Sequence, residues 1–401
     1  MPMIPYFATE KSKKIGLSLK NYLNEYIIPK ETEWLAMPFI KVEKLLRSRK
    51  KDMQEIGAWN LYLSSDHGGP GLTLMEIAQI SEIMGRTPFG HFLCNCQAPD
   101  AGNVELLLKY GSPKIVDTYL KPMLEGKIRS CFGMTEPHLA GSNPVRMDTK
   151  AKISDQEIFV SGHKWFTSGA DGASFCIVMA VTDPDNPNPY RKASMVILPT
   201  DNPGYKLIRN ISVMGHPGDG YLSHGEVKFE NARVPLNHLL GERGKGFVMA
   251  QERLGPGRIH HCMRWIGIAS RCFDMMCKRA VSREYSPGVV LGDKQMVQKM
   301  IAESKAEIDA ARLSVLHAAY IMENFGQKAA RQEISAIKFF TANVLQNVID
   351  RAIQIHGALG VTDDSILAWY YREERGARIY DGTDETHQSS LARQILKKFR
   401  S

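Results

Sequence analysis

The spacing of apolar residues changes twice along this chain, and these changes constrain its fold more than any other feature. From residue 11 to about residue 127, apolar side chains recur every three or four positions, which is typical of amphipathic helices. Near Ile128 the pattern changes to short strand-like runs, and after Gly246 the helical spacing returns. The pattern therefore predicts a helical region, a β region and a second helical region.

The central region contains several short strands without helical segments between them. They are expected near 131–134 and at 150–154, 156–168, 174–181, 194–198, 205–211 and 225–229. Such a succession is typical of a small antiparallel barrel or sandwich. We therefore predict an α+β, mostly α protein with three domains: an N-terminal α-helical domain at 1–127, a central antiparallel β domain at 128–240, and a C-terminal four-helix bundle at 241–401.

Four apolar stripes at helical spacing support the predicted bundle. They include Ile259, Met300, Ile337 and Ile395, one from each expected helix. Facing side chains in such a bundle can build a cofactor pocket. Pro256 lies within the first helix and cannot donate to its hydrogen-bond ladder, so we expect a break or kink there.

Composition limits the class of protein. The chain has 43% hydrophobic and 23% charged residues, values that are ordinary for a soluble globular protein and exclude a disordered or fibrous one. It contains no apolar run near the roughly 20 residues that span a bilayer. We expect a cytoplasmic protein that does not bind membranes. The net charge of +8 suits an anionic partner, such as a nucleotide, a phosphorylated cofactor or a nucleic acid.

No metal site is expected. The seven cysteines are scattered without any Cys-x-x-Cys pair, which argues against a zinc site and against a disulfide framework. His260 and His261 are adjacent, and neighbouring side chains on a helix point about 100° apart. This pair does not form a chelate, so we interpret it as structural.

A short turn near the C-terminus carries a carboxylate, a glycine and a hydroxyl in succession. The pattern predicts that Asp381, Gly382 and Thr383 lie just before the last helix. The start of a helix offers free N–H groups that suit an anion or a polar cofactor edge. A carboxylate held beside such donors can serve as a general base. The alternative is that Asp381 and Thr383 only cap the helix.

Three further motifs, taken with the domain order, resemble the acyl-CoA dehydrogenase family. Residues 132–142, Phe-Gly-Met-Thr-Glu-Pro-His-Leu-Ala-Gly-Ser, look like the first signature of that family. Residues 165–167, Trp-Phe-Thr, are similar to its flavin-contacting strand, and residues 354–358, Gln-Ile-His-Gly-Ala, to its Gln-x-x-Gly-Gly motif with the last glycine replaced. The resemblance covers nearly the whole chain and implies the fold predicted above.

The resemblance implies that the chain binds FAD and acyl-CoA. Thr135 would meet the polar edge of the flavin, Trp165 and Thr167 would lie against its ring, and Arg283 would reach the pyrophosphate of FAD in a neighbouring subunit. The implied cofactor-binding residues are Phe132, Met134, Thr135, Gly141, Ser142, Trp165, Phe166, Thr167, Arg283, Gln295, Gln354, Gly357, Ala358, Thr383 and Glu385, and the implied substrate-binding residues are Ser142, Arg253 and Gly382.

The resemblance also implies a catalytic carboxylate. Asp381 occupies the position of the family's usual glutamate, followed by the matching Gly382 and Thr383. Aspartate is one methylene shorter, which changes its reach. Glu252 is the alternative base, because it matches the position that some family members use instead.

The subgroup is identified as the branch that in animals is fused to a phosphotransferase-like kinase domain. The sequence from Arg253 to Arg264 carries this resemblance. It implies an acyl-CoA dehydrogenase of fatty acid β-oxidation that acts on medium- to long-chain or 4-hydroxy acyl-CoA. It also implies electron transfer to an electron-transferring flavoprotein and a homodimer or homotetramer. An acyl-CoA oxidase, a DNA-associated flavoprotein and a catalytically silent flavoprotein of the same fold are the alternatives, although nucleic acid is not the favoured partner.

Overall fold

The computed structural model describes residue 3 and residues 7–400 of the chain, which forms two compact units. Unit 1 contains Met1–Ala36, Arg49–Cys94 and Gly255–Ser401, and unit 2 contains Met37–Ser48 and Asn95–Leu254. Each unit therefore joins segments that are far apart in the sequence. Within the described residues, no helix has both the length and the hydrophobicity that crossing a bilayer requires.

The N-terminal part of unit 1 is helical, as predicted, and its main helices begin at side chains that satisfy free N–H groups. α1 (Glu10–Tyr22) begins after Thr9, whose hydroxyl accepts an N–H from the first turn. α5 (Leu74–Met84) begins with a capping box between Thr73 and Glu76. α1 and α5 pack together. The shorter helices here are η2 (Leu23–Ile27), η3 (Ile28–Lys30), α2 (Glu31–Leu35), α4 (Lys50–Ile56), η4 (Ser65–His67) and α6 (Gly90–Leu93).

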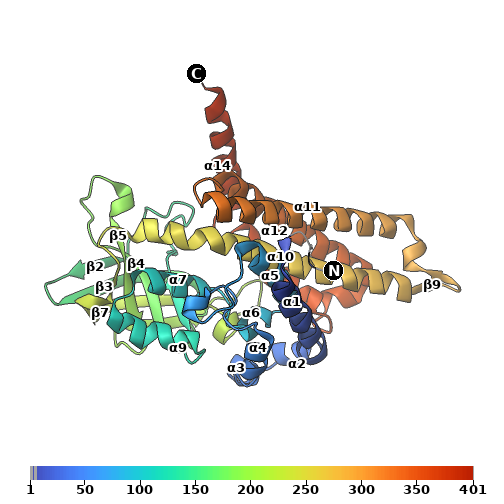
Figure 1. The fold of residues 1–401 in the computed structure, drawn as a ribbon, viewed down its shortest axis with the longest axis horizontal. Helices are drawn as coiled ribbons and strands as arrows, with labels where there is room; N and C mark the ends of the chain where they lie inside the picture. The colour runs from blue at the N-terminus through green and yellow to red at the C-terminus, as the bar shows by residue number, and fades with distance from the viewer. Residues whose placement is uncertain (1–2, 4–6, 401) are drawn as a thin grey trace. The chain divides into compact units, whose positions relative to one another are not determined.

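The C-terminal part of unit 1 is the predicted helical bundle. Its central helix packs against three others, and Figure 1 shows these helices in orange and red. Ile337 on the central helix is buried, as the apolar spacing predicts. The central helix is α12 (Arg331–His356), and its neighbours are α11 (Gln295–Phe325), α13 (Ile366–Glu374) and α14 (Asp384–Leu396). Short elements connect the helices: β9 (Glu284–Ser286), β10 (Val289–Val290), η9 (Leu291–Asp293), η10 (Gly357–Val361), η11 (Arg375–Arg378) and η12 (Lys397–Phe399).

Of the break or kink expected at Pro256, the break does not occur. α10 runs without interruption from Gly246 to Ser282, with Pro256 inside it. A proline removes one backbone N–H from the ladder, but the helical hydrogen bonds on either side are enough to keep the helix continuous. The division between the two units falls at Gly255, one residue before this proline.

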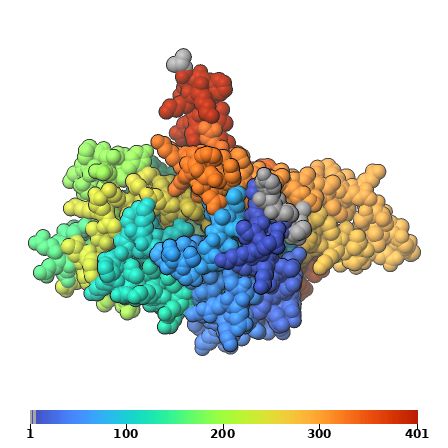
Figure 2. All heavy atoms as spheres, in the orientation of Figure 1, coloured from blue at the N-terminus to red at the C-terminus, as the bar shows by residue number. Residues whose placement is uncertain are grey.

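The last apolar stripe of the sequence is not buried as the bundle prediction requires. Ile395 is 42% exposed, Leu396 is 50% exposed and Phe399 is 80% exposed. Figure 2 shows the end of α14, in red, extending beyond the orange helices of its own unit. Helical spacing therefore predicted the helix correctly, but not its burial.

Unit 2 is built on one sheet, with short helices from two separate segments. The strand order is β6-β7-β3-β2-β4-β5-β8, and β1 pairs with β4 outside this path. The core consists mainly of β-branched and small residues, including Val160, Val178, Val196 and Val227, all fully buried. The strands are β1 (Ser130–Gly133), β2 (Lys150–Ile153), β3 (Glu157–Ser168), β4 (Phe175–Val181), β5 (Ala193–Pro199), β6 (Tyr205–Asn210), β7 (His224–Pro235) and β8 (Leu239–Leu240).

The sheet is mixed, so the prediction of a wholly antiparallel domain is wrong in this respect. β1 runs parallel to β4, with Ser130 opposite Phe175, and β2 meets β4 in parallel at Lys150 and Val181. The other pairings in this sheet are antiparallel. Strand direction depends on how distant segments meet, which local residue patterns do not encode.

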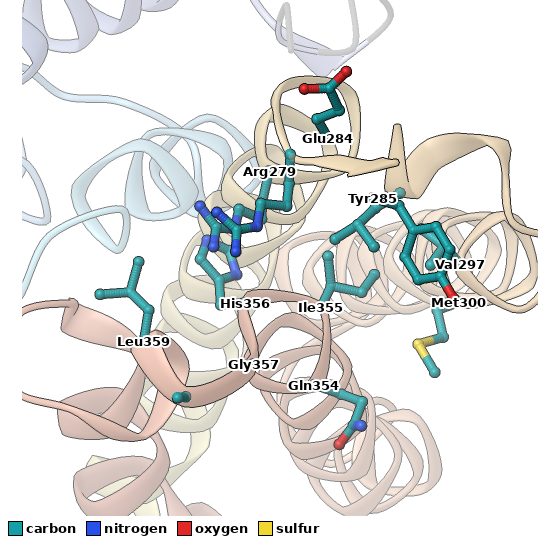
Figure 3. A pocket seen from close by; sticks show the side chains of 13 residues that line it. Arg279, Glu284, Tyr285, Val297, Met300, Gln354, Ile355, His356, Gly357 and Leu359 are labelled. Carbon is teal, nitrogen blue, oxygen red and sulfur yellow. The ribbon is translucent and has the colours of Figure 1, made fainter. Parts of the chain in front are cut away.

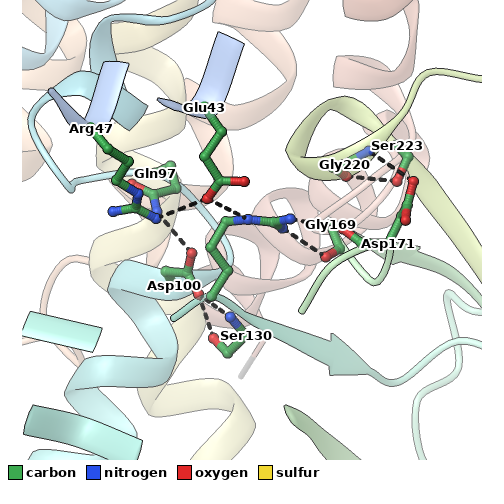
Figure 4. Close-up of polar contacts among 10 residues, drawn as sticks. Glu43, Arg47, Gln97, Asp100, Ser130, Gly169, Asp171, Gly220 and Ser223 are labelled. Atoms are coloured by element: carbon green, nitrogen blue, oxygen red, sulfur yellow. Dashed lines mark hydrogen bonds and ion pairs between the residues drawn. The ribbon is translucent and has the colours of Figure 1, made fainter. Parts of the chain in front are cut away.

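Buried polar contacts join the helices of unit 2 to its sheet (Figure 4). Arg129 is 4% exposed; its guanidinium donates to the carbonyl oxygens of Gly169 and Asp171 and lies 3.3 Å from Glu43. Asp100 accepts the N–H of Ser130. These contacts fix the start of β1. The helices of unit 2 are α3 (Phe39–Arg47), α7 (Asp100–Tyr110), α8 (Pro113–Ile115), η5 (Val116–Leu120), α9 (Lys121–Leu124), η6 (Pro189–Arg191), η7 (Gly220–Leu222) and η8 (Leu236–His238).

Candidate active site

The turn that carries Asp381 has an unusual backbone. Asp381 has a φ of 55° and Gly382 a φ of 101°, so two successive residues lie in the left-handed region. Most side chains disfavour this region, and such residues persist where surrounding contacts hold them. The turn lies between η11 and α14 in unit 1.

Three side chains hold this turn through its carbonyl oxygens. Arg258 on α10 donates from Nε to the carbonyl oxygen of Asp381 at 3.2 Å, and Nε2 of His387 on α14 lies 3.1 Å from the same oxygen. Lys338 on α12 donates from Nζ to the carbonyl oxygen of Gly382 at 2.8 Å. Side chains from three helices of unit 1 therefore contact two consecutive carbonyl oxygens, those of Asp381 and Gly382.

The Asp381 carboxylate lies among positive groups. Its Oδ2 is 3.3 Å from Nε2 of His261 on α10, and each of the two side chains is 22% exposed. Burial lowers the pKa values of Arg258 and Lys338, and the attraction of Asp381 opposes this shift in both cases. The surroundings therefore favour a charged carboxylate that solvent or a small ligand can reach.

Thr383 caps α14, and Asp381 does not. The Thr383 hydroxyl accepts the N–H of Thr386 at 3.3 Å. Asp384 is buried, 2.7 Å from Arg378. The capping alternative therefore applies to Thr383, while the Asp381 carboxylate points to a different helix. Glu385, a predicted cofactor residue, is exposed on the first turn of α14.

Glu252, the alternative base, lies in unit 2. Its Oε2 is 2.8 Å from Nζ of Lys109, and it also accepts the Tyr110 hydroxyl. Burial acts to raise the pKa of Glu252, but the hydrogen bonds from Lys109 and Tyr110 outweigh it and lower the pKa below its usual value. Both of these hydrogen bonds reach the same oxygen, Oε2, so the Glu252 carboxylate is already engaged by neighbouring side chains of its own unit.

Arg253 also lies in unit 2 and turns toward α7 and β1. It donates from Nε to Oδ1 of Asn103 at 3.2 Å and from its guanidinium to the carbonyl oxygen of Pro99 at 3.3 Å. Its guanidinium carbon lies 4.3 Å from the ring centroid of Phe132. The contact places Arg253 beside one residue of the predicted cofactor set.

Two predicted flavin motifs lie side by side in unit 2. Thr135 donates from its hydroxyl to the carbonyl oxygen of Trp165 at 2.8 Å, and Trp165 donates its N–H to the carbonyl oxygen of Thr135 at 3.1 Å. Lys164, fully buried, donates to the carbonyl oxygen of Met134. A Cβ at Gly141 would come within 3.1 Å of the Thr135 side chain, so the loop closes tightly there; Ser142 beyond it is exposed.

The next two residues of the strand fit a bound flavin. Phe166 is 45% exposed and has a φ of 48°, an unusual conformation for an aromatic residue. The Thr167 hydroxyl is buried and has no hydrogen-bond partner among the described residues. Buried hydroxyl groups are normally paired. An exposed aromatic ring beside an unpaired hydroxyl matches the apolar face and polar edge of an isoalloxazine ring.

Four predicted cofactor residues line a cavity of about 680 Å³ in unit 1 (Figure 3). Arg283, Gln354, Gly357 and Ala358 all line it, although about 70 residues separate the first from the others. Arg279 and His356 lie together on one wall, and burial together with the charge of Arg279 lowers the pKa of His356. Two guanidinium groups at one cavity suit a diphosphate. Gln295, at the start of α11, is not among the lining residues.

The sequence reasoning missed four residues of these sites: Arg258, His261, Lys338 and Arg279. The spacing of Arg258, His261 and Trp265, at i, i+3 and i+7, already places them on one face of a helix. The sequence therefore contained the information that these side chains share a face. It did not show which part of the chain this face contacts.

Family models describe nearly the whole chain. They match the N-terminal domain of acyl-CoA dehydrogenases at residues 9–127, the middle domain at 131–232 and the C-terminal domain at 244–396. The chain belongs to the acyl-CoA dehydrogenase family. This family is FAD-dependent, so the cofactor predicted from the sequence is confirmed.

The relatives confirm the predicted branch. Probable acyl-CoA dehydrogenase FadE2 of Mycobacterium tuberculosis is 42% identical, over 89% of this chain and 86% of the relative. Acyl-CoA dehydrogenase family member 10 of mouse is 39% identical, over 96% of this chain but 37% of the relative. The chain thus spans little more than a third of the length of that relative.

A solved structure supports the fold. It comes from a Mycobacterium abscessus protein assigned to the acyl-CoA dehydrogenases, with 36% identity and a TM-score of 0.92 over 98% of this chain and 99% of the other. The predicted fold, helical with a central sheet domain and a C-terminal helical bundle, is therefore confirmed, apart from the parallel strand pairs described above.

Proposed function

We propose that the chain is an FAD-dependent acyl-CoA dehydrogenase in which Asp381 removes the α-proton of an acyl-CoA, giving a trans-2-enoyl-CoA. The observation that carries this proposal is the Asp381 carboxylate itself. It is held by its backbone on three helices, is surrounded by cations, and keeps 22% of its side-chain surface exposed. A general base needs both a fixed position and access to its substrate.

The turn that carries Asp381 also offers N–H groups to the negative charge that forms during the reaction. Removing the α-proton leaves negative charge on the thioester oxygen, which N–H donors can stabilise. The family resemblance assigns this role to the backbone N–H of Asp381. Arg258 and Lys338 hold the carbonyl oxygens of Asp381 and Gly382, so they fix the two peptide planes that directly follow this N–H.

FAD supplies the acceptor for the hydride that leaves the β-carbon. The residues proposed to hold its ring are Thr135, Trp165, Phe166 and Thr167, and the Thr167 hydroxyl supplies a donor or acceptor at the polar edge. Arg283 and Gln354 are proposed to receive the ADP portion of an FAD that belongs to a second copy of the chain. This assignment requires a homodimer or homotetramer.

The finer properties follow from the resemblance to the branch. We propose a medium- to long-chain or 4-hydroxy acyl-CoA as the substrate, a place in fatty acid β-oxidation, an electron-transferring flavoprotein as the electron acceptor, and a cytoplasmic location. The basic charge of the chain is compatible with the phosphate groups of both CoA and FAD.

The test is an anaerobic titration of the purified flavoprotein with acyl-CoAs of increasing chain length, with and without a 4-hydroxyl group. Bleaching of the flavin absorption band by one of them is the expected result, and the rates rank the substrates. A bound flavin that no acyl-CoA bleaches would contradict the proposal. Reoxidation by oxygen faster than by electron-transferring flavoprotein would instead indicate an oxidase.

A further inference from the structure

His261 stands at the proposed base, although the sequence alone gave it only a structural role. Its Nε2 lies 3.3 Å from Oδ2 of Asp381, which makes the two groups an ion pair when the imidazole is protonated. His261 lies on α10, one turn beyond Arg258, which holds the backbone of the same aspartate. One face of α10 therefore contacts both the main chain and the side chain of Asp381.

Two aromatic rings fix the orientation of His261. The Trp265 ring stacks against the imidazole at a centroid distance of 6.1 Å and an angle of 26°, and the Tyr380 ring meets it at 5.7 Å and 63°. The Tyr380 hydroxyl accepts hydrogen bonds from Nε1 of Trp265 and from Arg264, both at 2.9 Å. The imidazole is thus packed against two rings that also contact each other, with a centroid distance of 5.9 Å.

A fixed imidazole at one carboxylate oxygen determines where the other oxygen lies. The carboxylate is planar, and an aspartate side chain has only two rotatable bonds, so a contact at Oδ2 sets the direction of Oδ1. Arg258 and His387 already hold the carbonyl oxygen of Asp381, and Lys338 holds that of Gly382. The contact from His261 removes the remaining freedom of the side chain.

We propose that His261 is a positioning residue for the base: it orients the Asp381 carboxylate through Oδ2, so that the other oxygen takes the α-proton of the acyl-CoA. This inference rests on the proposed function and deepens it. The proton passes from the α-carbon to the carboxylate, and the electron pair of that bond moves toward the thioester. His261 does not itself take the proton.

Other charged groups face the same pair and bear on its pH dependence. They include His91 on α6, whose pKa the charge of His261 helps to lower, Arg258 and Arg264 on α10, Lys338 on α12, His387 and Asp384 on α14, and Glu374 at the end of α13. Arg264 pairs with Glu374, and Asp384 pairs with Arg378. Two of these groups, Arg258 and Lys338, attract the Asp381 carboxylate.

The first test measures the contact without any reaction. The Cε1–H signals of the twelve histidines are followed by NMR over a pH series in the full-length flavoprotein, and the His261 signal is assigned as the one missing in His261→Gln. With Asp381→Asn, the titration midpoint of His261 should move to lower pH, because the carboxylate that stabilises its charged form is gone. The exposed His317 on α11 serves as the internal control, and its signal should be the same in both proteins. An unmoved His261 midpoint would overturn the proposal.

The second test measures positioning in the reaction. In His261→Leu, the rate constant of flavin reduction at saturating acyl-CoA should fall about tenfold, below the about 10²- to 10⁴-fold expected for loss of the base itself. The half-saturating acyl-CoA concentration should change less than about twofold. His261→Gln places an amide N–H near the position of Nε2, so it should recover most of the rate and lose one ionisation from the pH profile.

His260→Gln is the matched control, because His260 is adjacent on the same helix and points about 100° away. It should keep the wild-type rate and pH profile. A loss of rate in His260→Gln as large as that in His261→Leu would show a general effect on α10 and overturn the positioning role. If the wild-type flavin is bleached by no acyl-CoA while the NMR midpoint still moves, the proposed function fails and the contact between His261 and Asp381 stands.

Discussion

Lys338 donates from Nζ to the carbonyl oxygen of Gly382 at 2.8 Å, so a buried ammonium group on α12 fixes the residue that follows the proposed base. The same Nζ donates to the carbonyl oxygen of Ala377 at 2.6 Å, and the side chain is 1% exposed. Burial lowers the pKa of Lys338, while Asp381 acts in the opposite direction. The conformation of the turn therefore depends on the Lys338 side chain. Water could not replace it at both carbonyl oxygens unless the surrounding residues moved.

Lys338→Met should destabilise the protein by about 1–3 kcal/mol. The substitution keeps the length of the side chain but leaves two buried carbonyl oxygens without their donor. The measurement is denaturant unfolding of the flavoprotein. Lys305→Met, which removes an exposed ion pair with Asp309, is the control and should change the unfolding free energy by less than about 0.5 kcal/mol. Equal changes in the unfolding free energy of the two variants would contradict the role of Lys338 as the donor that stabilises this turn.

The stability of the protein should fall in mild acid. Burial lowers the pKa values of His260 and His387 to about 4, below the value of about 6.5 in an unfolded chain. The folded state therefore excludes protons that the unfolded state binds, so stability is complete above about pH 6.5 and is lost as the pH falls toward 4. Each histidine contributes up to about 3 kcal/mol.

The acid effect is measured by unfolding at pH 7, 6, 5 and 4. In His387→Gln, the loss between pH 6.5 and 4 should be smaller than in the wild type, because His387 no longer contributes to it. The surface variant His317→Gln should lose as much stability as the wild type. An identical pH dependence in all three proteins would contradict the prediction.

Thr167→Val should weaken FAD binding without destabilising the protein that lacks FAD. Valine has the same shape, and the hydroxyl it replaces is buried with no partner among the described residues. The FAD dissociation constant should rise about three- to tenfold, which corresponds to one hydrogen bond. The readouts are flavin fluorescence titration and thermal unfolding of the apoprotein.

A second threonine provides the control for this prediction. The Thr182 hydroxyl lies 2.6 Å from the Ser194 hydroxyl and is already paired. Thr182→Val should therefore lower the stability of the apoprotein and leave the FAD dissociation constant unchanged. The reverse pattern in the two variants would show that the Thr167 hydroxyl does not face the cofactor.

The two candidate bases can be separated by isosteric amides. Asp381→Asn should lower the rate of flavin reduction about 10²- to 10⁴-fold while FAD remains bound. Glu252→Gln should lower it less than about threefold, because Glu252 is already paired with Lys109 and Tyr110. Stopped-flow absorbance with saturating acyl-CoA makes the comparison. A larger effect of Glu252→Gln would assign the base to Glu252 instead.

Local patterns predicted most of the elements but not how some of them meet. The strands at 150–154 and 174–181 were expected from β-branched and apolar runs, yet their parallel contact is set by segments that lie far apart in sequence. Helical spacing predicted the last helix, but not that Phe399 would be exposed. Periodicity reports which face is apolar and carries no information about what covers it.

In the candidate site, too, local patterns predicted the elements but not how all of them meet. The order Asp381, Gly382, Thr383 predicted a turn before a helix, and Thr383 is the N-cap. The position of His261 beside Asp381 depends on the direction of one side chain across about 120 residues of sequence. Arg283 and Gln354 were predicted separately through a resemblance, and the fold brings them to one cavity.

The left-handed backbone at Asp381 also explains which acid stands there. Aspartate and asparagine adopt positive φ several times more readily than longer side chains, because a short polar group can interact with its own main chain. A glutamate at this position would extend further, but it would first have to enter a conformation that it disfavours. In this chain the turn itself selects the shorter carboxylate, so the identity of the acid reflects the shape of the peptide backbone as well as the distance to the substrate.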